Sequence, residues 1–163
     1  MTTSSISIRP AVESDLSEIV RMLADDPLGS QRERSVDPLP NSYYAAFEAI
    51  QQDSNNELVV AEAKDGGIIA VLQLTFTPYI THQGGWRATI EAVRVDSQYR
   101  GSGLGRDLLT WAICRAQNHG CHLVQLTTDK ERPKALKFYE SLGFMASHEG
   151  MKLKLSEWPR NVT

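Results

Sequence analysis

The sequence lacks most features that mark secreted or membrane proteins. Its 163 residues include only two cysteines, Cys114 and Cys121, and no apolar run approaches the roughly 20 residues that a membrane-spanning helix needs. Residues 2–5 after Met1 are polar, and the N-terminus contains no apolar core of a signal peptide. We therefore expect a cytoplasmic protein with two free thiols and no membrane contact.

The chain also has no run of basic residues. It contains 17 lysines and arginines against 20 acidic residues, which gives a formal net charge of -3. Proteins that bind nucleic acids usually present a basic face, so we expect no nucleic-acid partner. The four histidines show no metal-ligand spacing, because Gly120 interrupts the helix between His119 and His122. We expect no metal.

Hydrophobic periodicity predicts a mixed α+β protein with the element order β-α-α-β-β-β-α-β-α-β-β. The length fits one domain covering residues 1–163. The pattern predicts helices that begin near residues 14, 41, 103 and 133. It predicts strands at residues 6–9, 57–63, 68–77, 86–95, 122–127, 144–147 and 151–155.

One segment of the sequence points to specific chemistry. A β-rich stretch ends at Val95, three glycines follow at positions 101, 103 and 105, and a leucine-rich helix begins at once. Glycines allow the backbone to turn sharply and to bring its N–H groups close to a bound group. The start of a helix adds unpaired N–H donors and a partial positive charge. The segment therefore predicts a site for phosphate or diphosphate.

The segment differs from the two best-known phosphate-binding loops. It lacks the Gly-Lys-Ser/Thr ending of a P-loop, and its glycines do not have the Gly-x-Gly-x-x-Gly spacing of a dinucleotide fingerprint. Arg100, Gly103 and Gly105 instead match the pattern Arg-x-x-Gly-x-Gly.

Two motifs together resemble the GNAT superfamily of acetyltransferases. The first runs from Val93 as Val-x-Val-Asp-x-x-Tyr-Arg-Gly-x-Gly-x-Gly and resembles the family's coenzyme A-binding motif. The second, Ala-Leu-Lys-Phe-Tyr-Glu-Ser-Leu-Gly-Phe at residues 135–144, resembles its Ala-x-x-Phe-Tyr-x-x-x-Gly-Phe signature. The resemblance implies a GNAT-type fold, with a mostly antiparallel sheet of six to seven strands flanked by about four helices.

The resemblance also implies an N-acetyltransferase that uses acetyl-coenzyme A as cosubstrate and a primary amine as acceptor, which attacks directly in a ternary complex. Tyr139 would protonate the departing thiolate, since a tyrosine hydroxyl carries its proton at neutral pH. The family often has asparagine where this chain has Arg132. The residues that would contact the coenzyme are Val93, Arg94, Val95, Arg100, Gly101, Ser102, Gly103, Leu104, Gly105, Arg106 and Arg132.

Amine acetylation needs a base, because an ammonium group must lose a proton before it can attack. Glu91 is the first candidate, since the family often has an acidic residue four positions before Val95. Strand alternation would place Glu91, Val93 and Val95 on one face if no bulge intervenes. The alternative is that Glu91 only pairs with Arg87 or Arg94. His82 is a second candidate base, although a histidine in a loop is usually just exposed to solvent.

The sequence leaves the acceptor and the exact function open. The acceptor could be a small molecule or a peptide, and a homodimer is one assembly that spare strand edges would allow. The alternative functions are a non-catalytic, regulatory coenzyme A-binding module and an acyltransferase that uses another acyl-coenzyme A. Candidate acceptor contacts come from the early helices, from the loops at residues 28–35 and 78–85, and from the start of the strand after the second loop: Arg32, Glu33, Arg34, Tyr43, Tyr79 and Trp86.

Overall fold

The computed structural model describes residues 6–159, so the polar N-terminal residues 1–5 lie outside the described part. The chain forms two compact units that are joined in sequence after Leu126. The first contains the sheet, and the second contains one α-helix and an extended C-terminal segment. The expectation of a single domain over residues 1–163 stays a prediction.

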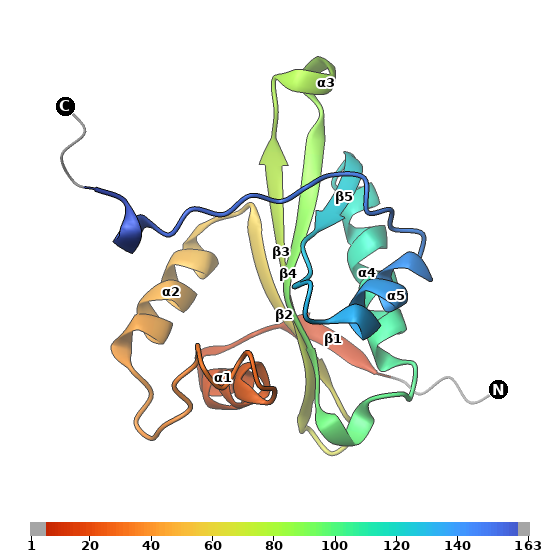
Figure 1. Ribbon diagram of the computed structural model, residues 1–163. Coiled ribbons are helices and arrows are strands. Elements are labelled where there is room, and N and C mark those ends of the chain that lie inside the picture. Colours follow the sequence, from red (N-terminus) through yellow and green to blue (C-terminus); the bar gives the residue numbers. More distant parts are fainter. Residues whose placement is uncertain (1–5, 160–163) are drawn as a thin grey trace. The chain divides into compact units, whose positions relative to one another are not determined.

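The first unit contains five strands and most of the helices (Figure 1). In chain order its elements are β1 (Ser7–Pro10), the 3₁₀ turn η1 (Glu13–Asp15), α1 (Leu16–Ala24), α2 (Asn41–Gln52), β2 (Asn56–Glu62), β3 (Ile68–Pro78), the short turn α3 (Thr81–Gly84), β4 (Trp86–Val95), the 3₁₀ turn η2 (Ser97–Tyr99), α4 (Leu104–Asn118) and β5 (Cys121–Leu126).

The five strands form one sheet in the order β1-β2-β3-β4-β5. The first four pair antiparallel, and β5 runs parallel to β4. A parallel pair requires a crossover connection, and α4 provides it between β4 and β5. The glycine-rich segment therefore lies at the start of this crossover.

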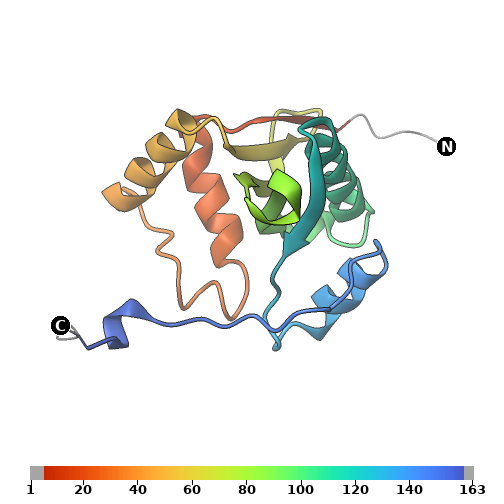
Figure 2. The same ribbon diagram turned by 90° about the horizontal axis from the view of Figure 1, so that it is seen from above.

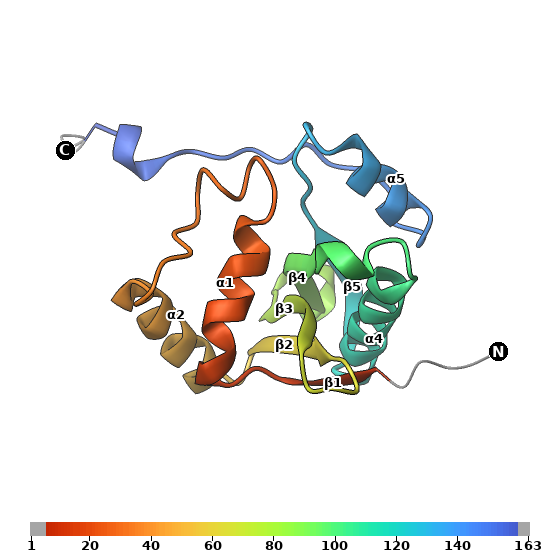
Figure 3. The same ribbon diagram turned by 90° about the horizontal axis from the view of Figure 1, so that it is seen from below.

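Helices cover both faces of the sheet, with α1 and α2 on one side and α4 on the other (Figures 2 and 3). On the first side, Ile19, Val20 and Phe47 pack into one buried cluster with Val60 and Val71 of the sheet. On the second side, helical spacing turns one stripe of α4 inward, and its members Leu108, Leu109 and Ala112 are fully buried.

The fold class is confirmed, but the strand count is lower than expected. The residues at 144–147 and 151–155 form no ladder in the described part, because an alternating sequence makes a strand only when another strand pairs with it. The amide of Ser147 instead bonds to the carbonyl of Met145, and a 3₁₀ turn, η3 (Leu155–Glu157), follows. The side chain of Met151 is 95% exposed.

The second unit contains α5 (Pro133–Glu140), which begins with proline in its first turn and ends before Gly143. Gly143 has a φ of 93°, which favours glycine. The reversed chain lets the amide of Phe144 bond to the carbonyl of Tyr139 at 3.2 Å, and the two ring centroids lie 6.0 Å apart. The Phe-Tyr and Gly-Phe parts of the second motif therefore build one helix end.

Two buried carboxylates fix the ends of the first unit's turns. Asp15 accepts hydrogen bonds from Arg9 at 2.7 Å and from the Val12 amide at 2.8 Å. Asp96, directly after β4, accepts from the Gln98 amide at 2.9 Å and from the Arg21 side chain. The bond from Gln98, with that from Arg21, lowers the pKa of Asp96 below its ordinary value despite burial.

We predict that Asp96→Asn lowers the free energy of unfolding at neutral pH by on the order of 2 kcal/mol, because a charged hydrogen-bond acceptor is lost. The folded-state pKa is depressed, so the stabilisation is present above the unfolded value of about 3.9 and is lost as pH falls through the folded value. Urea unfolding of wild type and variant should therefore differ at neutral pH and converge in acid. The exposed Glu48→Gln is the control, and a gap that persists undiminished in acid would contradict the prediction.

Candidate functional site

A β-bulge shapes the centre of β4. Arg94 pairs with Val71 and Glu91 pairs with Gln73, so three steps on β4 match two steps on β3. Ala92, inside this interval, has a φ of 53°, a left-handed conformation that is uncommon for alanine. The extra residue changes which side chains share a face downstream.

Because of the bulge, the expectation that Glu91 shares a face with Val95 is wrong. Directly paired residues on antiparallel strands share a face, so Glu91 lies with Arg94 on the side of Val71 and Gln73. Val95 pairs with Ala70 on the opposite face. Glu91 and Val95 therefore do not share a face, because the bulge breaks the alternation between them.

Glu91 is exposed and forms no hydrogen bond or ion pair within residues 6–159. The alternative that Glu91 pairs with Arg87 or Arg94 is therefore wrong. Arg94 instead lies 3.6 Å from the Asp26 carboxylate and donates to the carbonyl of Val93 at 2.8 Å. The Glu91 carboxylate is left available for a ligand on the face that α1 and α2 cover.

The pairing between β4 and β5 stops where the bulge begins. The parallel ladder runs from Trp86 and Cys121 to Ile90 and Leu126 and does not continue. Residues 91–95 therefore have no strand partner on their β5 side among the described residues. This segment includes Val93, Arg94 and Val95, which the sequence predicted as coenzyme contacts.

The glycine loop (residues 100–106) presents unbonded backbone donors. Gly101 and Gly103 have φ values of 78° and 94°, in the region that favours glycine. Within the described part of the chain, the amides of Gly101, Gly103 and Gly105 form no hydrogen bond. The amide of Leu104 has only a 3.5 Å contact to the Ser102 hydroxyl.

Two amides of the loop are already bonded to the protein. The Arg106 amide donates to the Gly103 carbonyl at 2.9 Å, and the Ser102 amide lies 3.4 Å from the Tyr99 carbonyl. The backbone donors that are available to a diphosphate are therefore the amides of Gly101, Gly103, Gly105 and Leu104.

The space in front of the loop is open. A β-carbon added at Gly101 or at Gly103 would meet no heavy atom within 4 Å. The 15-residue helix α4 begins directly behind these amides and adds the partial positive charge of its N-terminus. Open space, unbonded amides and positive charge together fit a diphosphate group.

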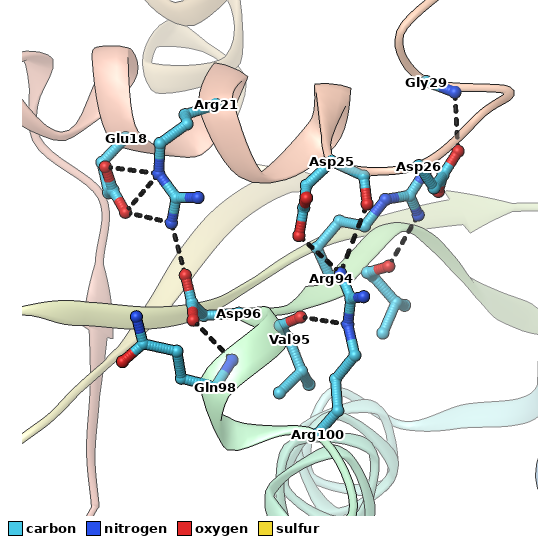
Figure 4. A network of polar contacts seen from close by, with 11 residues as sticks. Glu18, Arg21, Asp25, Asp26, Gly29, Arg94, Val95, Asp96, Gln98 and Arg100 are labelled. Carbon is cyan, nitrogen blue, oxygen red and sulfur yellow. Dashed lines mark hydrogen bonds and ion pairs between the residues drawn. The ribbon is translucent and has the colours of Figure 1, made fainter.

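Carboxylates from α1 and the residues after it hold the arginines around the loop (Figure 4). Arg100 donates to the Asp25 carboxylate at 2.8 Å and to the Val95 carbonyl at 3.1 Å. Arg21 bridges Glu18 and Asp96. The Arg100 side chain, predicted as a coenzyme contact, is thus also a brace between β4 and the end of α1.

Sequence reasoning missed the carboxylates of this frame. Asp25 and Asp26 lie about 70 residues from their arginine partners, and no local pattern signals such pairing. Asp96 could have been predicted from the sequence, because an aspartate side chain often accepts a hydrogen bond from the backbone amide two residues later and so caps a turn.

The acceptor candidates fall into separate groups. Tyr43 donates to Glu33 at 2.7 Å and accepts from the Arg34 amide at 3.0 Å, so it holds the loop after α1. Trp86 packs against His119, whose ring also stacks on Phe76 at 3.9 Å. This contact places Trp86 on the α4 side, away from Glu91.

His82 lies at the tip of the hairpin between β3 and β4. Its ring centroid is 4.9 Å from that of His122. From Trp86 to Glu91 the strand alone extends roughly 17 Å, at about 3.4 Å per residue. The structure therefore does not bring His82 to Glu91.

Tyr139 and Arg132 belong to the second unit. Tyr139 is half-buried on α5, with its ring centroid 5.4 Å from that of Phe138. Arg132 precedes α5, and its carbonyl accepts from the amides of Ala135 and Leu136 at 3.0 and 3.2 Å. Their roles toward a coenzyme stay predictions.

A cavity of about 450 Å³ lies elsewhere in the first unit. It is lined by parts of β1, β2, α2 and α4, including Phe47 and Trp111, and by the Arg115–Glu57 ion pair. None of the sequence-predicted site residues lines it. Size alone does not make it the site, because the unbonded amides and the exposed carboxylate lie elsewhere.

Two further sequence expectations concern the cysteines and membrane-spanning helices. Both cysteines are free thiols, with Cys114 exposed and burial raising the pKa of Cys121. Within residues 6–159, no helix is both long and apolar enough to cross a bilayer.

Comparison with known proteins gives consistent matches. The model of the Acetyltransferase (GNAT) family matches residues 18–144. A glucosamine 6-phosphate N-acetyltransferase from Trypanosoma brucei brucei is 38% identical over 90 residues, which are 55% of this chain and 59% of that protein. The chain spans about half the length of such curated relatives.

Two solved structures match nearly the whole chain. A transcriptional regulator from Bacillus halodurans C-125 is 59% identical with a TM-score of 0.88, covering 91% of this chain and 99% of that one. A Trypanosoma brucei acetyltransferase is 30% identical with a TM-score of 0.74, covering 93% of this chain and 100% of that one.

Proposed function

This chain belongs to the acetyltransferase (GNAT) family, and from that premise we propose that it transfers the acetyl group of acetyl-coenzyme A to a primary amine. The observation that carries the proposal is the set of amides at Gly101, Gly103 and Gly105 that are unbonded within residues 6–159, with open space beside Gly101 and Gly103 at the start of α4. Such a set of donors suits the diphosphate of the coenzyme.

The chain's own residues would bind and orient both substrates. The glycine loop (residues 100–106) would hold the diphosphate, and the unpaired edge of β4 from Val93 to Val95 would bind the pantetheine arm. Arg132 is proposed as a further contact. When bound, the coenzyme supplies an acetyl group activated as a thioester, and the amine attacks it directly in a ternary complex.

Glu91 is proposed as the general base. Its carboxylate is exposed and engaged by no other described residue, so it is available to take a proton from an ammonium group. It also lies at the point where β4 loses its β5 partner, next to the proposed pantetheine segment. His82 is not proposed, because the hairpin holds it near His122.

Tyr139 is proposed as the general acid that returns a proton to the coenzyme sulfur. The motif around it supports this role, because the helix end at Gly143 and the Phe144 ring restrict its position. The role requires that its hydroxyl reach the sulfur in the ternary complex.

A second candidate function is a regulatory module that binds the coenzyme without catalysis. The 59% identity to a protein described as a transcriptional regulator supports this second candidate, because one fold can carry different functions. Thiol release measured against a panel of amines separates the two functions, because only an enzyme releases thiol in proportion to acetylated amine. Succinyl- and propionyl-coenzyme A in the same assay test other acyl donors.

Location and assembly are also proposals. The two free cysteines support a reducing compartment, so we propose the cytoplasm. A homodimer is proposed as the assembly to test by sedimentation.

We predict that Gly103→Ala weakens coenzyme A binding. The left-handed φ of 94° should cost alanine roughly 1–2 kcal/mol, and the methyl group would fill the open space in front of the amides. Gly120→Ala is the matched control, because Gly120 has a φ of 82° and similar open space but lies at the other end of α4. Thermal-shift titration with coenzyme A measures binding as stabilisation. If both variants lose stability yet bind the coenzyme like wild type, the loop does not hold the diphosphate.

We predict that Glu91→Gln lowers kcat by on the order of 10²-fold near neutral pH, because the amide cannot accept the substrate's proton. Coenzyme binding should be unchanged. The measurement is the pH–rate profile of wild type and variant, with the exposed Glu13→Gln as control. An unaltered profile would remove Glu91 from the mechanism.

We predict that Tyr139→Phe lowers kcat by about 10²-fold or more while leaving coenzyme affinity intact, because only the proton donor is removed. The control is Tyr44→Phe, which removes a hydroxyl from a tyrosine packed against the core under α2. Single-turnover measurement of thiol release reports the chemical step. Full activity of Tyr139→Phe would rule out its role as acid.

A further inference from the structure

A row of polar side chains covers part of the sheet face on the side of α1 and α2. Cross-strand pairing places Asn56, Thr75 and Thr89 on this face, because each pairs directly with the next across β2, β3 and β4. Gln125 continues the row across the sheet because it pairs with Thr89, and Gln73 lies on the same face two residues from Thr75 along β3. We call these five residues the polar row.

The polar row is held by its own hydrogen bonds. Asn56 accepts from Gln73 at 3.2 Å and from Thr75 at 2.7 Å. Gln125 donates to the Thr89 hydroxyl at 3.1 Å. These side chains are half-buried, so this face offers fixed polar groups where an apolar core face would be expected.

Arg87 lies at the hairpin end of this face. It pairs with Thr77, two residues beyond Thr75 on β3, and therefore projects to the same side as Thr89 and Glu91. Its guanidinium stacks over the Tyr79 ring at 4.5 Å from the centroid. Tyr79 is fixed in turn, because its amide donates to the Gly85 carbonyl at 2.9 Å.

Arg87 has no anionic partner in the part of the chain that the structure describes. Within residues 6–159 it forms no hydrogen bond and no ion pair, although the chain contains 20 acidic residues. Its Nε is fully buried without an acceptor, whereas its terminal nitrogens are not fully buried. A half-buried guanidinium held by stacking, with its terminal donors unused, is suited to an anion from outside the protein.

Arg87 and Glu91 define the two ends of a substrate track along β4. They are four residues apart on one face of the strand, which separates their α-carbons by roughly 14 Å at about 3.4 Å per residue. Thr89 lies between them. A molecule whose amine reaches Glu91 can therefore extend an anionic group toward Arg87.

The geometry points to Arg87 as the residue that selects amine acceptors carrying an anionic group, a carboxylate or a phosphate, several bonds from the reacting nitrogen. This inference rests on the proposed function and specifies its acceptor. Arg87 binds the anion with its terminal nitrogens, Tyr79 positions the guanidinium, and the polar row contacts the polar body of the acceptor.

The test compares acceptors in pairs that differ only in the anion. Glucosamine 6-phosphate is paired with glucosamine, and a tripeptide with a free carboxyl end is paired with its amide. Wild type should show a lower KM for the anionic member of a pair, and the pair that shows it distinguishes phosphate from carboxylate. Arg87→Gln should raise that KM about tenfold or more, because one partner of a charge pair is lost. It should leave kcat and the KM of the neutral member unchanged.

Two further variants separate recognition from a structural role. Arg87→Lys should restore part of the affinity, since it keeps the charge but not the two-pronged geometry. Lys64→Gln, which removes an exposed cation from the turn between β2 and β3, should change neither member of a pair. Losses that are equal for anionic and neutral acceptors, or absent for both, would overturn the assignment of Arg87 and leave acetyl transfer intact.

Binding provides the same test without turnover. Calorimetry of glucosamine 6-phosphate and of the tripeptide with protein saturated in coenzyme A should show weaker binding to Arg87→Gln than to wild type. Equal affinities in both proteins would overturn the inference. Failure of the wild type to bind coenzyme A would instead contradict the proposed function, so the two failures are distinguishable.

Discussion

The extra residue in β4 at Ala92 is the constraint on which the rest of the site depends. Without it, strict alternation would turn Val93 and Val95 to the face of Glu91, and Arg94 to the opposite face. With it, Arg94 lies on the face of Glu91, Thr89 and Arg87, and Val95 lies on the other face. The left-handed backbone at Ala92 is slightly strained. The pairing with β3 on one side and the ion pairs after β4 hold the backbone in this conformation.

The same bulge separates two chemical environments along one strand. Before it, β4 pairs on both sides and its α4 face is apolar, with Ala88 and Ile90 buried. After it, the strand has one partner and is surrounded by arginines held by Asp25, Asp26 and Asp96. These carboxylates neutralise the arginines near the glycine loop (residues 100–106), whose positive charges would otherwise repel one another at short distance. The arginines beside the loop are thus held by ion pairs, whereas the amides of Gly101, Gly103 and Gly105 form no hydrogen bond within residues 6–159.

Much of this arrangement could be predicted from the sequence, because its signals are local. The glycines at 101 and 103 need left-handed backbone, and a leucine stripe follows them, so the loop and α4 were predictable from neighbouring residues alone. The same holds for α5, where proline opens the helix and Gly143 closes it. The prediction of strands at the C-terminal end was wrong. The alternation at residues 151–155 shows only that the segment would suit a half-buried strand, and it contains no information about whether a partner strand is present.

The sequence by itself therefore indicated the elements as far as α5 and the glycine loop, because these follow from short-range backbone preference and side-chain periodicity. The family was indicated by the resemblance of two motifs. Only the tertiary structure decided the faces that Glu91 and Val95 occupy, the pairing of Asp25 and Asp26 with arginines about 70 residues away, and the lack of an acidic partner for Arg87 within residues 6–159. A one-residue bulge reverses the orientation of side chains, and charge pairing depends on distance in space. Neither is written in the local pattern of residues.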